Sequence, residues 1–302
     1  MKRYFFLLII LIIANQLHAQ DSSLLNMLSD SMQANAKSMP VRGTFKGLYI
    51  VDMKTVESSA KGALNFLIMH RFGRLNDGAY NFFGLDNATI RLGLDYGITN
   101  RLAVGIGRSS LDKTFDGYFK YRLLWQTDGS ERMPLSLSVS GGLTNYTLKF
   151  PDKTYLNARY RTTYVTQLIA ARKFSSALSL QLVPVWMHYN LVPTVQDKND
   201  VFAIGAGGRM KLTHRMSITA EYNYLLPNQV NSLEVHNALS VAWEIETGGH
   251  VFQLVFTNAQ GMTEPQAISR TTGDWGKGDV YFGFNISRVF NVSHKAKKKE
   301  VY

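Results

Sequence analysis

The chain lacks cysteine and lacks any long hydrophobic run. With no cysteine among its 302 residues, it can form no disulfide bond, perform no thiol chemistry and carry no lipid-modified cysteine. The apolar run from Tyr4 to Ile13 is shorter than the roughly 20 residues that a helix needs to span a bilayer, and no later run approaches that length. The route that remains into a membrane is through β-strands, whose closure into a barrel must supply the stability.

The N-terminus has the three parts of a secretory signal. Met1-Lys2-Arg3 is charged, the run from Tyr4 to Ile13 is apolar, and Leu17-His18-Ala19 ends on a small residue before Gln20. We expect cleavage after Ala19, so that residues 1–19 are a signal peptide and the mature chain is exported. A helical anchor is the alternative, and the length and flanks of the run disfavour it.

Charge is scarce for a soluble protein, since charged residues make up 18% of the chain while aromatic residues make up 12%. Part of the net charge of +11 comes from the signal and from Lys295, Lys297, Lys298 and Lys299. Because a run of like charges usually stays solvated, residues 291–302 are expected to be a basic periplasmic tail. Nucleic acid is not expected as a partner.

Apolar and polar residues alternate one for one along much of the chain. The pattern is clearest in Ala88–Tyr96 and Leu239–Ile245, where every second residue is apolar. Side chains on a strand alternate between its two faces, so one face would meet lipid and the other a polar lumen. The sequence therefore predicts an all-β fold, an antiparallel transmembrane β-barrel of about twelve strands within residues 59–290. The strands are expected near residues 60–72, 87–97, 102–109, 114–126, 135–146, 158–173, 178–190, 201–212, 216–226, 237–246, 250–258 and 279–290.

The connectors between these segments alternate in length. Short turns face the periplasm and long loops face outward in membrane barrels, so an even number of strands returns the C-terminus to the periplasm. Two connectors break the alternation, the short one near Ser110 and the long one from Thr127 to Pro134. The tight connectors are residues 98–101, 174–177, 213–215 and 247–249, and the long ones are residues 73–86, 147–157, 191–200, 227–236 and 259–278.

The apolar positions define a face for lipid, with aromatic residues near strand ends as in membrane barrels. The last strand, Val280 to Phe290, ends on an aromatic residue, which is typical of the assembly signal of outer-membrane barrels. The lipid bilayer of the outer membrane and the barrel-insertion machinery are therefore the expected partners, although the basic tail departs from that signal. A soluble secreted β-sandwich is the alternative fold, and the strand lengths and aromatic ends argue against it. The predicted lipid-facing residues include Ile90, Leu92, Leu94, Phe115, Phe119, Leu123, Trp125, Leu178, Leu180, Leu182, Trp186, Phe252, Leu254 and Phe256.

Residues 20–58 do not share this alternation. Apolar residues from Leu24 to Met32 have helix-like spacing up to Pro40, and Thr44 to Val51 has an extended pattern between glycines. This segment is either a periplasmic lead-in or a plug folded into the lumen. Periodicity alone does not separate the two, and we favour the lead-in slightly.

Several short sequence segments resemble those of a family of uncharacterised bacterial outer-membrane β-barrel proteins, classed as domain of unknown function 5777. The resemblance extends over most of the mature chain from about Thr44 onward, and His70-Arg71-Phe72-Gly73 is its most specific part. It implies location and architecture, and it brings no activity that can be assigned to particular residues. The segments are His70–Asn76, Asn81–Asp86, Ile90–Gly97, Leu102–Arg108 and Phe256–Gly261.

Charged residues fall at inward positions of the predicted strands. Hairpins near residues 214 and 232 would bring Arg209, Glu221 and Glu244 to similar heights, where opposite charges can pair. The sequence supports two interpretations of these charged residues equally. They form either a selectivity constriction for a charged or hydroxylated solute or an ion-pair ladder that fills a narrow barrel. The candidates for lining the lumen are Arg91, Asp95, Lys120, Arg122, Arg209, Glu221 and Glu244.

Other chemistry finds little support in the sequence. His70, His188 and His236 fall near the predicted outer rim on separate strands, without the spacing of metal ligands, so no metal site is expected. Serine and histidine do not recur in an arrangement typical of a nucleophile with its base. We expect no enzyme activity and no cofactor.

The leading hypothesis is a monomeric outer-membrane β-barrel that passes small polar or charged solutes through a narrow channel, or serves a structural role. One alternative is a surface-binding barrel that uses its long outer loops, especially residues 73–86 and 259–278. Another is a membrane-embedded lipid hydrolase, which we consider the weakest.

Overall fold

A computed structural model describes residues 39–129 and 132–292 of the chain. The predicted signal peptide, residues 20–38 and the basic tail beyond residue 292 lie outside the described residues. The described residues belong to two units. In the smaller unit, β1 (Met39–Pro40) pairs antiparallel with β6 (Thr127–Asp128). The larger unit contains all other strands.

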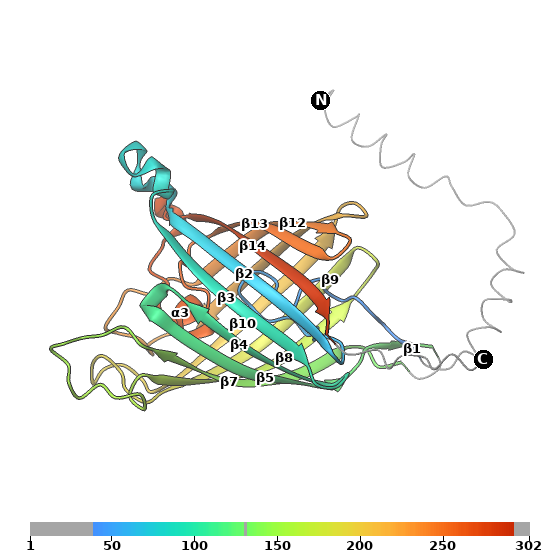
Figure 1. Cartoon of the computed structure of the whole chain (residues 1–302), viewed down its shortest axis with the longest axis horizontal. Helices are drawn as coiled ribbons and strands as arrows, with labels where there is room; N and C mark the ends of the chain where they lie inside the picture. The colour runs from blue at the N-terminus through green and yellow to red at the C-terminus, as the bar shows by residue number, and fades with distance from the viewer. Residues whose placement is uncertain (1–38, 130–131, 293–302) are drawn as a thin grey trace, which may run out of the picture. The chain divides into compact units, whose positions relative to one another are not determined.

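The larger unit is a closed barrel of twelve antiparallel strands (Figure 1). Each strand pairs with its neighbours in the sequence, and β14 pairs with β2 to close the ring. The predicted fold class and strand number are confirmed. The strands are β2 (Ala63–Arg74), β3 (Ala88–Gly97), β4 (Leu102–Ser109), β5 (Thr114–Leu124), β7 (Ser136–Tyr146), β8 (Thr162–Lys173), β9 (Leu178–Tyr189), β10 (Asp200–Lys211), β11 (Met216–Leu225), β12 (Ala238–Thr247), β13 (His250–Thr257) and β14 (Tyr281–Asn291).

The predicted strand boundaries differ from the observed ones by a few residues. The largest difference is in β8, which begins at Thr162 rather than near residue 158. In β5, the pairing with β7 has an irregularity between Arg122 and Leu124, and the strand ends before Trp125. Trp125 was predicted on the lipid face of this strand, and it lies beyond the end of β5 instead.

The alternation of side chains produces two distinct faces. In β3, Ile90, Leu92 and Leu94 are exposed on the outside, whereas Arg91 and Asp95 are buried inside. The outer surface therefore carries apolar residues that the sequence assigns to lipid. The described part of the chain contains no helix that is long and apolar enough to cross a membrane.

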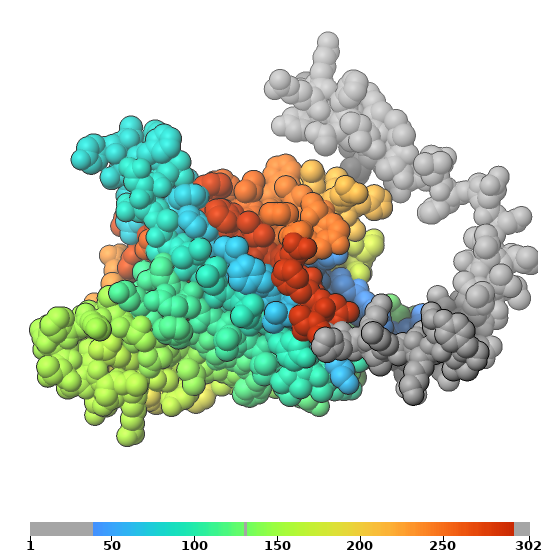
Figure 2. All heavy atoms as spheres, viewed as in Figure 1, coloured from blue at the N-terminus to red at the C-terminus, as the bar shows by residue number. Residues whose placement is uncertain are grey.

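The two ends of the barrel differ. At one end, here called the tight-turn end, short turns join β3 to β4, β8 to β9, β10 to β11 and β12 to β13. At the other, the long-loop end, residues 75–87 include the 3₁₀ segments η1 (Leu75–Asp77) and η2 (Ala79–Gly84). These residues and residues 147–161 stand out from the barrel in cyan and yellow-green (Figure 2). The two irregular connectors predicted from sequence are present: η3 (Leu111–Lys113) lies in a short link between β4 and β5, and a long connector separates the end of β5 at Leu124 from the start of β7 at Ser136.

Two of the segments that the structure describes lie in the interior of the barrel. The first, residues 44–59, is here called the lumenal hairpin, because it turns back on itself inside the barrel. Ile50 N donates to Met53 O at 2.8 Å and Thr55 N donates to Leu48 O at 2.8 Å, so the tip lies at residues 50–53. This part of the N-terminal segment, for which a lead-in before the barrel was slightly favoured, lies within the barrel.

The second inserted segment is the connector between β13 and β14, residues 258–280, here called the α3 loop. It carries α3 (Glu264–Ser269), in which Pro265 supplies a favourable residue for the first turn, and η4 (Trp275–Lys277). Five of the six α3 residues are buried, and α3 lies within the ring of strands (Figure 1). The hairpin and the α3 loop together form the interior packing of the barrel.

Candidate functional site

The inner wall contains two regions of opposite character. One region, here called the charged sector, lies on β2, β3 and β5. The other, here called the apolar sector, lies on β8, β9 and β10. The charged sector comprises Arg71, Arg91, Asp95, Asp116, Lys120 and Arg122, and the apolar sector comprises Val165, Ile169, Val183, Val185, Met187, Val201 and Ala203.

Within the charged sector, two predicted lumen-lining residues are paired to the wall itself. Arg91 Nε donates to Asp116 Oδ1 at 2.9 Å, and the second guanidinium nitrogen contacts Oδ2 of the same carboxylate. Asp95 Oδ2 accepts from Asn65 Nδ2 at 3.1 Å, and its Oδ1 accepts from the Tyr118 hydroxyl. Since buried charges are costly unless paired, these contacts account for the presence of both residues inside the wall.

Lys120 and Arg122 bind the lumenal hairpin. Lys120 Nζ donates to Thr55 O at 3.0 Å and also to the carbonyl oxygen of Glu57. Arg122 Nη2 donates to Val56 O and lies 3.3 Å from Glu57 Oε2. Both cations therefore satisfy backbone carbonyls that lack a strand partner, and neither faces an open passage.

Glu221 holds the tip of the hairpin. Its carboxylate accepts from the backbone nitrogens of Val51 at 3.0 Å, Asp52 at 3.1 Å and Met53 at 3.0 Å. Asp52 in turn forms an ion pair with Arg71, with Oδ1 and Nη2 2.8 Å apart. The sequence placed Glu221 near Arg209 and Glu244, but its partner is a segment about 170 residues earlier in the chain.

Amide side chains of the wall complete the support of the hairpin. Gln181 Oε1 accepts from Val56 N at 2.9 Å while its Nε2 donates to Lys54 O at 2.8 Å. Gln253 Nε2 donates to Ile50 O at 2.7 Å and Asn285 Nδ2 donates to Val51 O at 2.9 Å. The backbone of the hairpin is thus bonded to side chains of the wall rather than to strand edges.

The predicted pairing of Arg209 with Glu244 is present. Arg209 Nε donates to Glu244 Oε1 at 2.7 Å, and Nη2 contacts Glu246. Lys46 Nζ, at the start of the hairpin, lies 3.2 Å from Glu246 Oε2. This group is an ion-pair ladder near the tight-turn end of the lumen.

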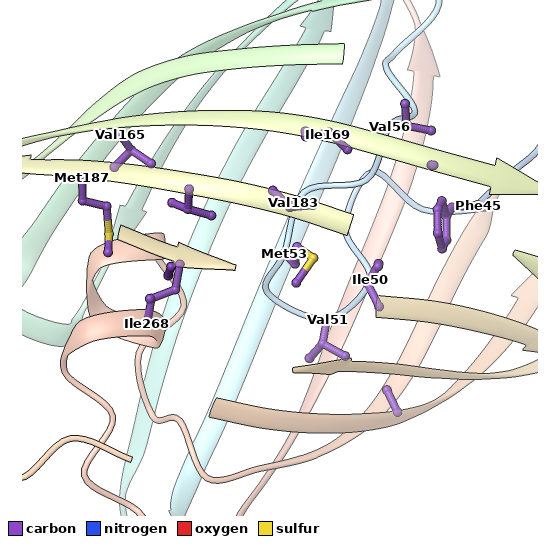
Figure 3. Packing of buried hydrophobic residues seen from close by; sticks show 14 of the residues in the cluster. Phe45, Ile50, Val51, Met53, Val56, Val165, Ile169, Val183, Met187 and Ile268 are labelled. Atoms are coloured by element: carbon purple, nitrogen blue, oxygen red, sulfur yellow. The ribbon is translucent and has the colours of Figure 1, made fainter. Parts of the chain in front are cut away.

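The apolar sector packs against the other side of the hairpin. Phe45, Ile50, Val51, Met53 and Val56 form one buried cluster with the apolar sector, joined by Ile268 of α3 (Figure 3). Two inward glycines of β10 make this contact possible. A Cβ on Gly205 would lie 2.5 Å from Met53 Cε, and one on Gly207 would lie 2.5 Å from Ile50 Cδ1.

The hairpin and the α3 loop meet near the middle of the lumen and close it. Lys54 of the hairpin forms an ion pair with Glu264 of α3, and Tyr49 packs with Met262 of the α3 loop. Two gaps beside the hairpin have volumes of about 10 Å³ each, room for about one water molecule. The seven predicted lumen-lining residues are all inside the barrel, but they surround packed chain segments.

A cavity at the long-loop end, above α3, is here called the vestibule. Its volume is about 630 Å³. Loops 147–161, 190–199 and 226–237 form its sides, and Pro265, Gln266 and Ser269 of α3 form one wall. Gln266 Nε2 donates to Thr114 Oγ1 at 3.1 Å, and the hydroxyls of Ser269 and Tyr189 are hydrogen bonded, which fixes α3 to β5 and β9.

Asp197 ties two vestibule loops together. Its Oδ1 accepts from the backbone nitrogens of Asn231 at 2.6 Å and Ser232 at 2.9 Å, and its Oδ2 accepts from Thr194 N at 3.1 Å and Thr194 Oγ1 at 3.0 Å. Desolvation raises the pKa of this carboxyl, but the hydrogen bonds outweigh that effect and hold the pKa well below its usual range. The loops therefore have a defined arrangement around the cavity.

The three histidines singled out from sequence lie on separate elements. His70 is on β2, where it stacks on Phe284, and His188 Nδ1 on β9 lies 2.9 Å from Asp200 Oδ1. His236 lies in loop 226–237, 3.6 Å from Glu234. Within residues 39–129 and 132–292, no group of three or more histidine, aspartate or glutamate residues is arranged to hold a metal ion.

Sequence reasoning missed the apolar sector and the vestibule. A signal for the first was present, because Leu182-Val183-Pro184-Val185-Trp186-Met187 is apolar without alternation. A strand that is apolar on both faces must be covered on both. The vestibule has no comparable signal, because its walls come from loops that are distant in sequence.

Comparison with known proteins gives a family and several distant structural likenesses. The chain matches the family model described as membrane bound beta barrel domain (DUF5777) over residues 45–290. No curated protein matches the chain. Among solved structures, the NanC porin has a TM-score of 0.47 at 8% identity, covering 75% of this chain and 98% of that chain. An outer membrane channel from Pseudomonas putida F1 has a TM-score of 0.46 at 13% identity, covering 78% and 97%.

Proposed function

This chain belongs to the membrane bound beta barrel domain family, and we propose that it is an outer-membrane channel that is closed at rest. In this proposal the lumenal hairpin and the α3 loop block the lumen, and the vestibule receives a small solute. The protein acts by binding and passage and carries out no catalytic step.

The observation that carries the proposal is how the hairpin is held. Its backbone is bonded to Glu221, Gln181, Gln253 and Lys120 of the wall, and none of these bonds belongs to a pairing between barrel strands. Water can replace such side-chain bonds, at a net cost of about 0.5–1.5 kcal/mol for a neutral partner and about 1.5–3 kcal/mol for a charged one. The hairpin can therefore leave the lumen while every strand pair of the barrel stays intact, which is the property that a gate requires.

The arrangement of the connectors supports the orientation. In outer-membrane barrels the short turns face the periplasm and the long loops face outward. We therefore place the vestibule on the outside, and the hairpin enters from the periplasmic side. Val41 N donates to Gln126 O at the tight-turn end, which is the point at which the hairpin enters the barrel.

A permanently closed barrel that acts through its outer loops is the second candidate. The apolar sector favours it, because displacing the hairpin would expose apolar side chains that pack against it, such as Val183, to water. Burial of each such side chain is worth about 1.5–3 kcal/mol. The two candidates differ in whether the hairpin ever leaves.

The substitution Gly207→Leu distinguishes the gated channel from the permanently closed barrel. A leucine side chain at this position occupies the space of Ile50 and forces the hairpin away, at a cost of about 1–3 kcal/mol in overpacking. In planar bilayers we expect rare openings for the wild type and frequent or sustained current for Gly207→Leu. Ala206→Leu, on the same strand but exposed on the lipid face, is the matched control and should behave as wild type.

Release of the hairpin can be measured separately from current. Because the chain has no cysteine, a single Thr55→Cys substitution reports on the hairpin by its rate of labelling with a maleimide. Heat-modifiable mobility on gels and circular dichroism confirm that the barrel is folded. A folded Gly207→Leu barrel that is labelled rapidly at position 55 but passes no current would rule out the channel.

A further inference from the structure

The vestibule has the size and lining of a ligand site. Its volume of about 630 Å³ is within the range of about 300–1,000 Å³ that holds small organic ligands. Aromatic side chains from the end of β7 and from loop 147–161 supply much of its apolar surface. The rings are those of Tyr146, Phe150, Tyr155 and Tyr160, with Tyr189 from β9.

The charges around the vestibule are unequal. Lys153, Lys198 and Arg270 line it together with Asp112 and Asp197. Both carboxylates are already engaged: Asp112 Oδ2 lies 2.8 Å from Arg270 Nη1, and Asp197 accepts four hydrogen bonds from its own loops. Two lysine cations therefore remain as the charges available to a ligand.

Neither lysine is paired with an acid. Among the residues that the structure describes, no carboxylate oxygen lies within 4.0 Å of Lys153 Nζ or Lys198 Nζ. Lys153 Nζ lies 5.3 Å from the centroid of the Phe150 ring, so one cation is placed directly beside an aromatic surface. A ligand that combines an anionic group with an apolar body would satisfy both features at once.

We propose that the vestibule binds a small amphipathic anion, with an aromatic or branched apolar body and a single carboxylate. This inference rests on the proposed function, since it names the class of solute that the closed channel receives. The body of the ligand lies against the tyrosine and phenylalanine rings, and the carboxylate lies between Lys153 and Lys198. Pro265 and Ser269 place α3 in the same wall, so the ligand rests on the segment whose Glu264 contacts the hairpin.

The proposal can be tested with three probes that share one apolar body. Isothermal titration of the full-length protein in detergent, corrected against protein-free micelles, would compare 4-phenylbutyrate, 4-phenylbutan-1-ol and 4-phenylbutylamine. We expect the carboxylate to bind most tightly, the alcohol more weakly and the amine weakest. The advantage of the carboxylate over the alcohol should shrink as salt is raised, because salt screens the attraction to the lysines.

Substitution of the lysines assigns the site. In the double variant Lys153→Gln and Lys198→Gln, we expect affinity for 4-phenylbutyrate to fall roughly tenfold at low salt, with little change for the alcohol. Lys149→Gln is the matched control. Lys149 is an exposed lysine of the same loop and does not line the vestibule, so its removal should leave all three affinities unchanged.

Equal affinity for the carboxylate and the alcohol in the wild type would overturn the proposal. An anion preference that survives in the double variant would overturn it as well, since it would place the anion site elsewhere. Both outcomes are independent of conductance. A barrel that binds the carboxylate as expected but never conducts would disprove the channel and leave the binding site standing. A barrel that conducts but shows no preference for the anion would disprove the binding site and leave the channel standing.

Discussion

The charged and apolar sectors of the inner wall contact opposite sides of the same hairpin by different means. In the charged sector the contacts are polar: Lys120 and Arg122 bind main-chain carbonyls, and Arg71 forms an ion pair with Asp52 of the hairpin. In the apolar sector, the contact depends on particular side chains, such as Ile50 against the space left by Gly207. The charged sector thus holds the hairpin through hydrogen bonds and ion pairs, and the apolar sector holds it through close packing of side chains.

The two sectors also differ in whether water can form new contacts with the wall once the hairpin is released. A hydrogen bond exchanged for water contributes only about 0.5–1.5 kcal/mol net, rising to about 1.5–3 kcal/mol when one partner is charged. An apolar side chain that returns to water loses about 1.5–3 kcal/mol, and nothing in water replaces its contacts. A solute with an apolar body would lower that cost by covering the exposed wall. The difference between the sectors is therefore consistent with an amphipathic solute.

Truncation on the apolar side should have the largest effect. Ile50 is 1% exposed, and Ile50→Ala removes its contacts without adding charge. We expect a loss of about 2–4 kcal/mol in docking of the hairpin, so that a cysteine at position 55 is labelled at least about 30-fold faster. Ile204→Ala, on the lipid face of β10, is the control for the same change outside the lumen. Equal labelling rates in the two variants would mean that the apolar sector does not retain the hairpin.

Neutralising Glu221 should have a smaller effect. In Glu221→Gln the side chain keeps its shape but loses the charge that three backbone nitrogens share, and its amide group can no longer accept all of them. We expect a loss of about 1–2 kcal/mol and labelling at position 55 that is about 5- to 30-fold faster. Glu244→Gln removes a neighbouring inward carboxylate that binds Arg209 and has no direct bond to the hairpin. A larger effect from Glu244→Gln than from Glu221→Gln would show that the tip contact is unimportant.

The barrel could be predicted from the sequence because the alternation of apolar and polar residues is a local property of each strand. Alternation with a period of two assigns each side chain to a face by parity alone, so Arg91, Lys120 and Glu221 are inward wherever their strands lie in the ring. Connector lengths then fix how many strands there are. The start of β8 was placed early because Arg159 and Arg161 continue the alternation into the preceding loop.

The partners of the inward residues could not be predicted in the same way. Arg209 and Glu244 lie two strands apart around the wall, on β10 and β12, and this pair was found by parity and hairpin geometry. Glu221 and Lys120 instead bind a segment far away in sequence, whose docking depends on the total shape of the lumen. Parity indicates that a side chain points inward, but it does not indicate whether water or another part of the chain meets it.

The smallest expected effect concerns the vestibule. There Asp197, like Glu221 in the lumen, is a carboxylate that accepts hydrogen bonds from several backbone N–H groups. Its carboxylate collects backbone N–H groups from loop 226–237, and its pKa lies well below the ordinary value of about 3.9. A lowered pKa in the folded state means that the stabilisation is complete above about pH 4 and is lost as the pH falls further toward the folded pKa. At pH 6 we expect the amides of Asn231 and Ser232 to exchange hydrogen roughly threefold faster in Asp197→Asn than in the wild type. This ratio should fall steadily as the pH drops below about 4, because the carboxyl is then protonated when the loop opens but stays ionised in the folded state. Asp86→Asn, which changes an exposed loop carboxyl, should give a ratio near one throughout. A ratio for Asp197→Asn that stays constant from pH 6 to pH 2 would mean that ionisation of this carboxyl does not hold the loops.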